Sequence, residues 1–182
     1  MRIRARTDAV TGDFCENEDV SGANRDANTS PHTKENFTVT TREAQNKAIH
    51  RRYFAASDAA DLAAFDELMA PDFVNHYPGA PGPLNREATL QMGTMFWAAF
   101  SDHYYTIEDQ IAEGDKVATR LAWRAIHSGD FQGLPPTGRK VAVSGIAVAH
   151  IKDGIILEHW ATFDQMGMMQ QLGLVPPPQP AR

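Results

Sequence analysis

Apolar residues in this chain change their spacing near Ser101, and this change limits the folds open to it. Before that point, Ile49, Tyr53 and Ala56 recur at the i, i+4 and i+7 positions that form one face of a helix. After it, residues 105–111 alternate between apolar and polar, as in a strand with one buried face. Helices followed by long antiparallel strands predict an α+β domain in which the helices cover one face of a curved sheet.

Three helices are predicted in the first half of the domain. Thr40 and Glu43 have the spacing of a capping box, which would begin a helix that continues to about residue 56. A second, short helix over residues 62–69 would end before Pro71. Asn85 is the predicted N-cap of a third helix. The side chains that this third helix is expected to bury are Ala88, Met92, Met95, Phe96 and Ala99.

The second half of the domain is predicted to be mostly strands. The predicted strands are residues 105–111, 117–127, 140–151 and 155–163. The last two would be joined by a tight hairpin turn at Lys152-Asp153-Gly154. A short helix over Gln165–Leu172, with Gly173 at its C-terminal end, would close the domain.

The two ends of the chain differ in composition from the domain between them. Residues 1–40 are rich in charged residues and in Asn, Ser and Thr, have no sustained period, and are predicted to form a flexible tail. The prolines within residues 176–182 predict a short extended coda. The folded domain is therefore expected to span residues 41–175.

Composition argues against several classes of partner. Lys and Arg number 17 against 23 Asp and Glu, and no basic run offers a surface for phosphates, so nucleic acid is not an expected partner. No apolar run approaches the roughly 18–20 residues of a membrane span. The single cysteine, Cys15, rules out an intrachain disulfide, and the histidines lack the i, i+4 pairing of a helical zinc motif. We expect a cytoplasmic protein without a metal site.

Three stretches of the second half carry a resemblance to a known family. They are residues 107–117 (IEDQIAEGDKV), 129–139 (GDFQGLPPTGR) and 153–160 (DGIILEHW), followed by Asp164 and Gln171-Leu172-Gly173. Together they resemble the SnoaL-like polyketide cyclases, members of the nuclear-transport-factor-2-like superfamily. The resemblance covers roughly residues 44–174 and is most specific in the last third of the chain.

The resemblance implies a cone-shaped α+β barrel that often forms a homodimer through its sheet, here with Trp160 among the contacts. It also implies acid–base chemistry without a cofactor on a carbonyl compound, typically the aldol closure of a polyketide ring. In the founding cyclases an aspartate two positions after the histidine matching His159 is the general acid/base, and here that position is Ala161. Another polar position of the family falls on Ala147.

Four polar residues remain as candidates for chemistry. His159 would face the interior if its strand alternates regularly, and could exchange a proton, or could be a core histidine held by a buried hydrogen bond. His76, expected near the mouth of the pocket, could act as a base or be an ordinary loop histidine. Asn75 is the candidate for holding an enolate oxygen. Asp164 could take part in catalysis but is well placed to cap the helix that follows it.

Large apolar side chains would form the wall of the substrate pocket. An apolar pocket between helices and a bent sheet suits a flat or lipophilic ligand. The residues expected to line it, besides Asn75, are Tyr53, Trp97, Phe100, Trp123, Ala161 and Phe163.

Together these features predict an enzyme that removes a proton next to a carbonyl of a hydrophobic substrate, with His159 or His76 as base. Two alternatives stay open. Ala161 favours a ligand-binding or accessory protein that kept the fold without the chemistry. A dehydratase or isomerase on the same fold would use the histidine for a different acid–base reaction.

Overall fold

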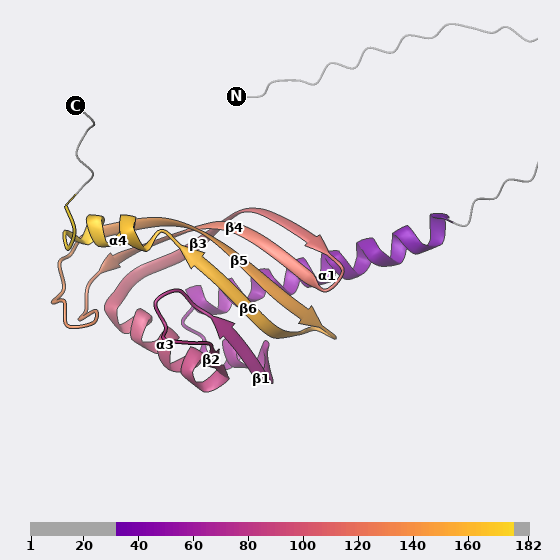
Figure 1. The fold of residues 1–182 in the computed structure, drawn as a ribbon, viewed down its shortest axis with the longest axis horizontal. Helices are drawn as coiled ribbons and strands as arrows, with labels where there is room; N and C mark the ends of the chain where they lie inside the picture. Colours follow the sequence, from indigo (N-terminus) through magenta and orange to yellow (C-terminus); the bar gives the residue numbers. More distant parts are fainter. Residues whose placement is uncertain (1–31, 177–182) are drawn as a thin grey trace, which may run out of the picture. The chain divides into compact units, whose positions relative to one another are not determined.

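The computed structural model describes residues 32–176, and Figure 1 shows their helices and strands. The predicted coda, apart from Pro176, and residues 1–31 of the predicted tail lie outside the described residues. The elements in chain order are α1 (His32–Asp58), α2 (Leu62–Glu67), β1 (Met69–His76), β2 (Leu84–Asn85), α3 (Arg86–Ala99), β3 (Phe100–Glu113), β4 (Lys116–His127), β5 (Lys140–Lys152), β6 (Ile155–Phe163) and α4 (Gln165–Leu172).

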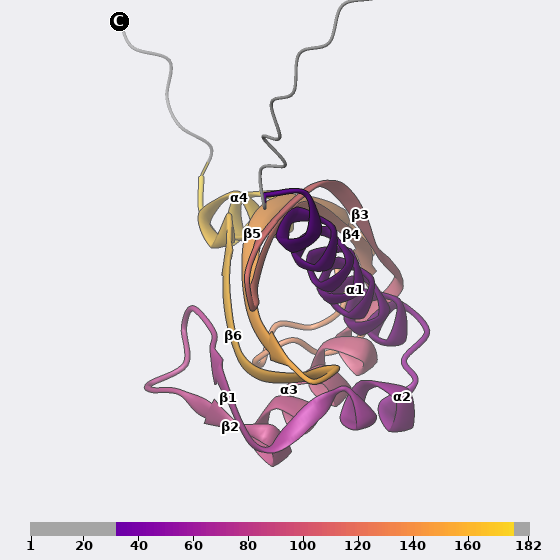
Figure 2. The same cartoon turned by 90° about the vertical axis from the view of Figure 1, so that its right-hand side faces the viewer.

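The strands form one sheet in the order β2-β1-β6-β5-β4-β3. Neighbouring strands are antiparallel except β1 and β6, which run parallel. Figure 2 shows β3 to β6 arranged around α1, with α2 and α3 close to β1. Side chains of β4 and β5 alternate strictly between buried and more exposed positions. This arrangement confirms the predicted α+β class and the mostly antiparallel sheet.

Helix α1 begins at His32, before the start predicted at Thr40. In a capping box the carboxylate of Glu43 would return to the backbone at the helix start. Instead, Glu43 accepts a hydrogen bond from the backbone N–H of Gly114 at 3.3 Å. The acidic side chain therefore joins the helix to the β3–β4 turn, and the capping-box prediction was wrong.

Strands β1 and β2 were not predicted. The helix before Pro71 does end there, at Glu67, but Met69 already belongs to a strand. The pairing of β1 with β6 shifts register between Met69 and Val74, around Pro71, which has no N–H for a ladder. This interruption hides the alternating pattern of the strand in the sequence.

The ends of the other helices agree closely with the sequence. Asn85 caps α3, because its side chain accepts a hydrogen bond from the N–H of Ala88 at 2.9 Å. In α4, Asp164 is the N-cap and Gly173 ends the helix with φ +82°. Met95, expected to be buried by α3, is 60% exposed, so that prediction was wrong.

None of the helices within residues 32–176 is both long and apolar enough to cross a membrane.

Candidate active site

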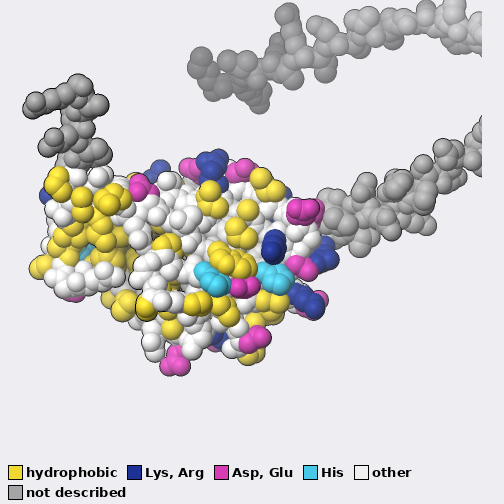
Figure 3. Space-filling view, viewed as in Figure 1, with side chains coloured by type: hydrophobic (Ala, Val, Ile, Leu, Met, Phe, Trp, Pro, Cys, Tyr) yellow, Lys and Arg dark blue, Asp and Glu magenta, His cyan; other side chains and the backbone are white. Residues whose placement is uncertain are grey.

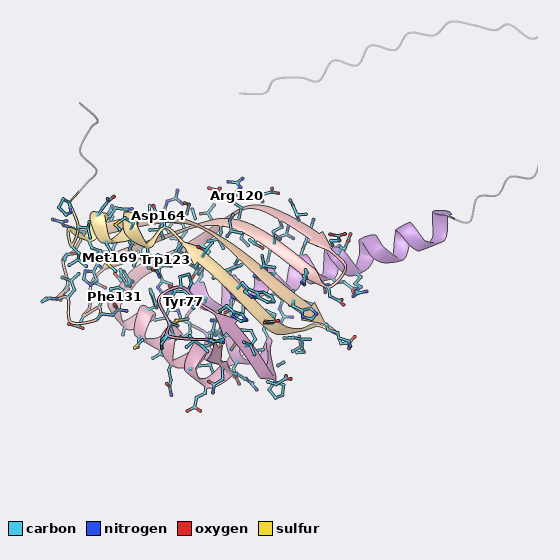
Figure 4. The ribbon with its side chains drawn as sticks, in the orientation of Figure 1. Tyr77, Arg120, Trp123, Phe131, Asp164 and Met169 are labelled. Carbon is cyan, nitrogen blue, oxygen red and sulfur yellow. The ribbon has the colours of Figure 1, made fainter. Side chains whose placement is uncertain are left out.

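A cavity lies between the helices and the inner face of the sheet. Residues from every helix and strand except β2 line this cavity. Tyr77, just after β1, and Asp164, just after β6, line it as well. Figure 4 labels Tyr77, Trp123 and Asp164, three wall residues from distant parts of the chain. Most of the wall is aromatic or aliphatic, so a ligand inside would be largely removed from water.

One edge of the cavity is polar and is formed by two adjacent strands. Asn75 on β1 and His159 on β6 are register partners, and their side chains are only 2% and 4% exposed. The Oδ1 atom of Asn75 lies 3.4 Å from Nδ1 of His159. The amide of Asn75 also donates to the hydroxyl of Thr89 on α3 at 3.4 Å. Strand pairing thus places an imidazole and an amide side by side in the wall.

A second buried histidine, His50 on α1, stands behind His159 and was missed in the sequence. The Nε2 atoms of the two rings are 3.3 Å apart. The Nδ1 atom of His50 lies 2.9 Å from the hydroxyl of Thr119 on β4. His50 follows Ile49 and precedes Tyr53 by one turn, on the face already predicted to be buried, and this position was the available signal.

Burial keeps both imidazoles in the neutral form. Loss of hydration lowers the pKa of His159 from its ordinary value to about 4. The pKa of His50 is also lowered, first by burial and then by the neighbouring His159. Near pH 7 each ring therefore has one nitrogen with a hydrogen and one with a free lone pair.

The tyrosines of the cavity are also held neutral. Burial raises the pKa of Tyr77 to about 12 and raises the pKa of Tyr53 and of Tyr105 further. The ring of Tyr53 packs against that of His159, with centroids 5.0 Å apart. These phenols can therefore serve as hydrogen-bond donors inside the cavity but are poor proton acceptors at neutral pH.

The structure brings most of the expected wall residues together. Besides Asn75 and His159, the wall contains Tyr53, Trp97, Trp123, Ala161 and Phe163. Phe100 is not part of it. Its fully buried ring lies behind the wall, packed on Trp123 and Phe131 at centroid distances of 5.1 Å, because it starts β3 directly after α3. The expectation that Phe100 lines the pocket was wrong.

His76 does not lie at the mouth of the cavity. It follows Asn75 on β1, so its side chain projects from the opposite face of the sheet. There its Nε2 lies 2.7 Å from Glu158, and its ring stacks on Trp160 at 5.2 Å. The placement expected from the sequence was wrong because residues 69–76 form a strand and not a loop.

Asp164 caps α4 and also lines the cavity. Its carboxylate accepts a hydrogen bond from the N–H of Gly167 at 2.8 Å and so caps α4, and the residue also belongs to the cavity wall. Next to it, Gln165 donates to the carbonyl of Pro78 at 2.8 Å, which ties α4 to the loop after β1. Within residues 32–176 no three His, Cys, Asp or Glu side chains are grouped so that they could hold a metal ion.

The sequence of this chain is similar to those of a known protein family and of characterised enzymes. Residues 47–172 match the profile of a family described as SnoaL-like polyketide cyclase. The aklanonic acid methyl ester cyclase DnrD of Streptomyces peucetius is 34% identical over 116 residues, 62% of this chain and 78% of that protein. The nogalonic acid methyl ester cyclase of Streptomyces nogalater is 31% identical over 113 residues, 59% of this chain and 82% of that protein.

A similar solved structure is that of wild-type IdmH, a candidate polyketide cyclase from Streptomyces antibioticus. It has 36% sequence identity and a TM-score of 0.65, and the match covers 71% of this chain and 99% of that one. The similarity therefore extends over almost the whole of that structure.

Proposed function

Because this chain belongs to the SnoaL-like polyketide cyclase family and is an enzyme of the cyclase type, we propose that its cavity closes a ring in a hydrophobic polyketide. The reaction is an intramolecular aldol addition that needs no cofactor. The family resemblance seen in the sequence is confirmed by the matching profile. The observation that carries the mechanism is the imidazole of His159 beside the amide of Asn75 in a wall that is mostly aromatic or aliphatic.

The first step is removal of a proton from a carbon next to a carbonyl. Neutral His159 has a lone pair, and its Nδ1 edge lies beside Asn75, another residue of the cavity wall. In the structure Asn75 presents its Oδ1 to Nδ1 and its N–H to Thr89. Nδ1 takes the proton from the substrate in the tautomer of His159 that has its hydrogen on Nε2, and the amide of Asn75 turns its N–H from Thr89 to the enolate oxygen that forms. A hydrogen bond of 3.4 Å between the two side chains is long, so substrate atoms can replace it at little cost.

In the second step, the enolate carbon attacks a second carbonyl of the same molecule. A carbon–carbon bond forms, and the carbonyl oxygen becomes an alkoxide. His159 returns its proton to this oxygen, so the product is an isomer of the substrate. The apolar wall holds the chain folded with its two reacting carbons close together, which supplies much of the rate enhancement.

The names of the curated relatives suggest the class of substrate. Those proteins are cyclases of aklanonic and nogalonic acid methyl esters. We extend this to the present chain as an aromatic polyketide ester, a flat and lipophilic compound that suits a wall containing Trp97 and Trp123.

The test is incubation of the full chain with aklanonic acid methyl ester and, separately, with nogalonic acid methyl ester in D₂O. We expect a cyclised product with the molecular formula of the substrate, apart from exchanged hydrogens, that chromatography separates from it, and deuterium at the attacking carbon of recovered substrate. Neither ring closure nor deuterium uptake with either ester would overturn the proposal. Tight binding of an ester without turnover would favour the second candidate function, a ligand-binding protein, which the alanine at position 161 supports.

We also propose that two copies of the chain associate through the outer face of the sheet. Figure 3 shows hydrophobic side chains over the strands of this face, among histidine and charged side chains. Ala142, Ser144 and Ile146 project outward from β5, and Ile146 is 50% exposed. Trp160, on the adjacent strand, is only partly covered by His76. Small and apolar side chains on the outer face of a sheet favour close packing of a second sheet.

A further inference from the structure

We propose that His50 is a positioning residue that lets a single atom, Nδ1 of His159, act first as base and then as acid. This inference rests on the proposed aldol reaction and adds a residue to it. His50 is not part of the cavity wall, so it acts only through His159. The basis is the contact between the two rings and the hydrogen-bonded chain in which they stand.

The hydrogen-bonded chain is a series of side chains that runs through the core, and its first and last members are amides. Gln110 on β3 donates to Thr119 at 2.9 Å, and Thr119 contacts His50. His50 contacts His159, and His159 contacts the amide of Asn75. As the amides stand, each group donates to the next from Gln110 toward Asn75, because Gln110 donates its N–H to Thr119 and Asn75 presents its oxygen to Nδ1 of His159. Rotation of both amides by 180° reverses the direction. In one direction Nδ1 of His159 has a lone pair, and in the other it has a hydrogen.

Small side chains on β5 leave space for the ring of His50 against the sheet. Its ring contacts Thr119 on β4 and His159 on β6, so it spans β5, the strand between them. The β5 residues in register with these two are Ala147 and Ala149, and both are fully buried. Their methyl groups leave space for an imidazole that a larger side chain would fill. Ala147 and Ala149 thus accommodate a polar group from α1.

A second imidazole addresses a difficulty of the mechanism. The cation of a buried histidine is costly, and this makes His159 alone a weak base. Once Nδ1 has taken the substrate proton, the proton on Nε2 can pass to Nε2 of His50, 3.3 Å away. His50 then has hydrogens on both nitrogens and donates to Thr119. Burial lowers the pKa of His50 as well, so the gain comes from sharing one proton between the two rings and not from better solvation of the cation.

The return of the proton completes the cycle. Nδ1 of His159 gives its hydrogen to the alkoxide, and His50 returns the Nε2 proton to His159. The net change is one C–H bond broken and one O–H bond formed, with both rings neutral again. The groups around the pair do not compete for the proton, since those bonded to it are an amide and a hydroxyl and Tyr53 packs against both rings.

The test compares His50→Gln and His50→Leu in the full chain. Glutamine can still hydrogen-bond to His159 but cannot take up a proton, whereas leucine can do neither. With aklanonic acid methyl ester we expect kcat to fall about 100-fold in both variants and KM to stay within about threefold. Asn46→Leu is the matched control, because Asn46 is a buried polar residue of the same helix that bonds to the carbonyl of Gly114 and not to His159. It should keep the kcat of the wild type.

A measurement without substrate separates this inference from the proposed reaction. In ¹⁵N-histidine spectra of the wild type, acidification should shift the nitrogen signals of His50 and His159 together, because one proton is shared. In His50→Gln the His159 signals should titrate at lower pH, because the cation has lost its imidazole partner. An unchanged titration of His159, or a wild-type kcat in His50→Gln, would overturn the role of His50. Joint titration without any turnover would leave the pair standing and reject only the proposed reaction.

Discussion

Ala147 on β5 and Ala161 on β6 are register partners whose methyl groups lie side by side on the inner face of the sheet, next to His159. The family resemblance implies polar side chains at both of these positions in the founding cyclases. Here the polar groups near them are the two imidazoles. We propose that the acid–base function lies instead with a pair of histidines, His159 on β6 and His50 on α1.

Restoring the carboxylate with Ala161→Asp tests this relationship. A carboxylate near His159 favours the imidazolium form and raises its pKa. We expect the acid limb of the pH profile of kcat to move upward, by about one pH unit or more, while turnover is retained. The measurement is kcat against pH with aklanonic acid methyl ester for both proteins. A profile that does not move would show that position 161 does not face the working imidazole.

Stability should depend on pH through the two buried histidines. The folded state holds His159 neutral with a pKa of about 4, against about 6.5 in the unfolded chain. A lowered pKa stabilises the fold fully above pH 6.5, and the contribution is lost as the pH falls from there toward 4. For His159 alone this amounts to about 2 kcal/mol of unfolding free energy between pH 7 and pH 5.

Urea unfolding at pH 7 and pH 5 measures this effect. His159→Gln should lose less stability than the wild type over the same interval, since glutamine does not titrate. An equal pH dependence in the two proteins would contradict the assignment of a buried neutral imidazole.

Gly145 is required by the packing of Phe163 on the neighbouring strand. The two are register partners, and a Cβ at Gly145 would lie 2.5 Å from Cδ1 of Phe163 and 2.8 Å from the carbonyl of Thr162. Gly145→Ala should therefore displace the Phe163 ring, which lines the cavity, and destabilise the fold by about 1–3 kcal/mol. Gly82→Ala is the matched control, because a Cβ there meets nothing within 4 Å. Thermal unfolding that ranks the two variants equally would contradict this packing.

The proposed dimer can be tested at Ile146. A charge at the centre of an apolar interface is costly to bury, so Ile146→Glu should give a monomer while the wild type is a dimer. Light scattering coupled to gel filtration measures the mass, and about 20 kDa for the wild type at micromolar concentration would reject the dimer. Asp130→Ala, at a position away from the strand faces, should leave the mass of the assembly unchanged.

Short sequence patterns correctly predicted the ends of two helices and the long strands. The cap residues Asn85, Asp164 and Gly173 fixed the ends of α3 and α4 because each acts on backbone groups within a few residues of itself. The long strands followed from simple alternation. β1 was missed because Pro71 and the register shift after it interrupt that alternation.

The site itself was predictable only in part. His159 and Asn75 were identified from the resemblance, but His50 looks like one more residue on a buried helix face. Its partners, Thr119 and His159, are 69 and 109 residues away in the chain, so only the folded structure brings them together. His76 was misplaced because the strand that contains it was not predicted. Its neighbour Asn75 faces the cavity, and the alternation of side chains in a strand turns His76 to the opposite face.

The central claim is that His159 handles the proton of ring closure, and the most direct measurement is the kcat of His159→Gln on aklanonic acid methyl ester. Glutamine preserves the size and hydrogen bonding of the side chain but has no proton-accepting nitrogen, so kcat should fall at least about 100-fold while the circular dichroism spectrum is unchanged. His76→Gln, on the opposite face of β1, is the matched control and should retain the kcat of the wild type. A His159→Gln protein that closes the ring as fast as the wild type would contradict the account.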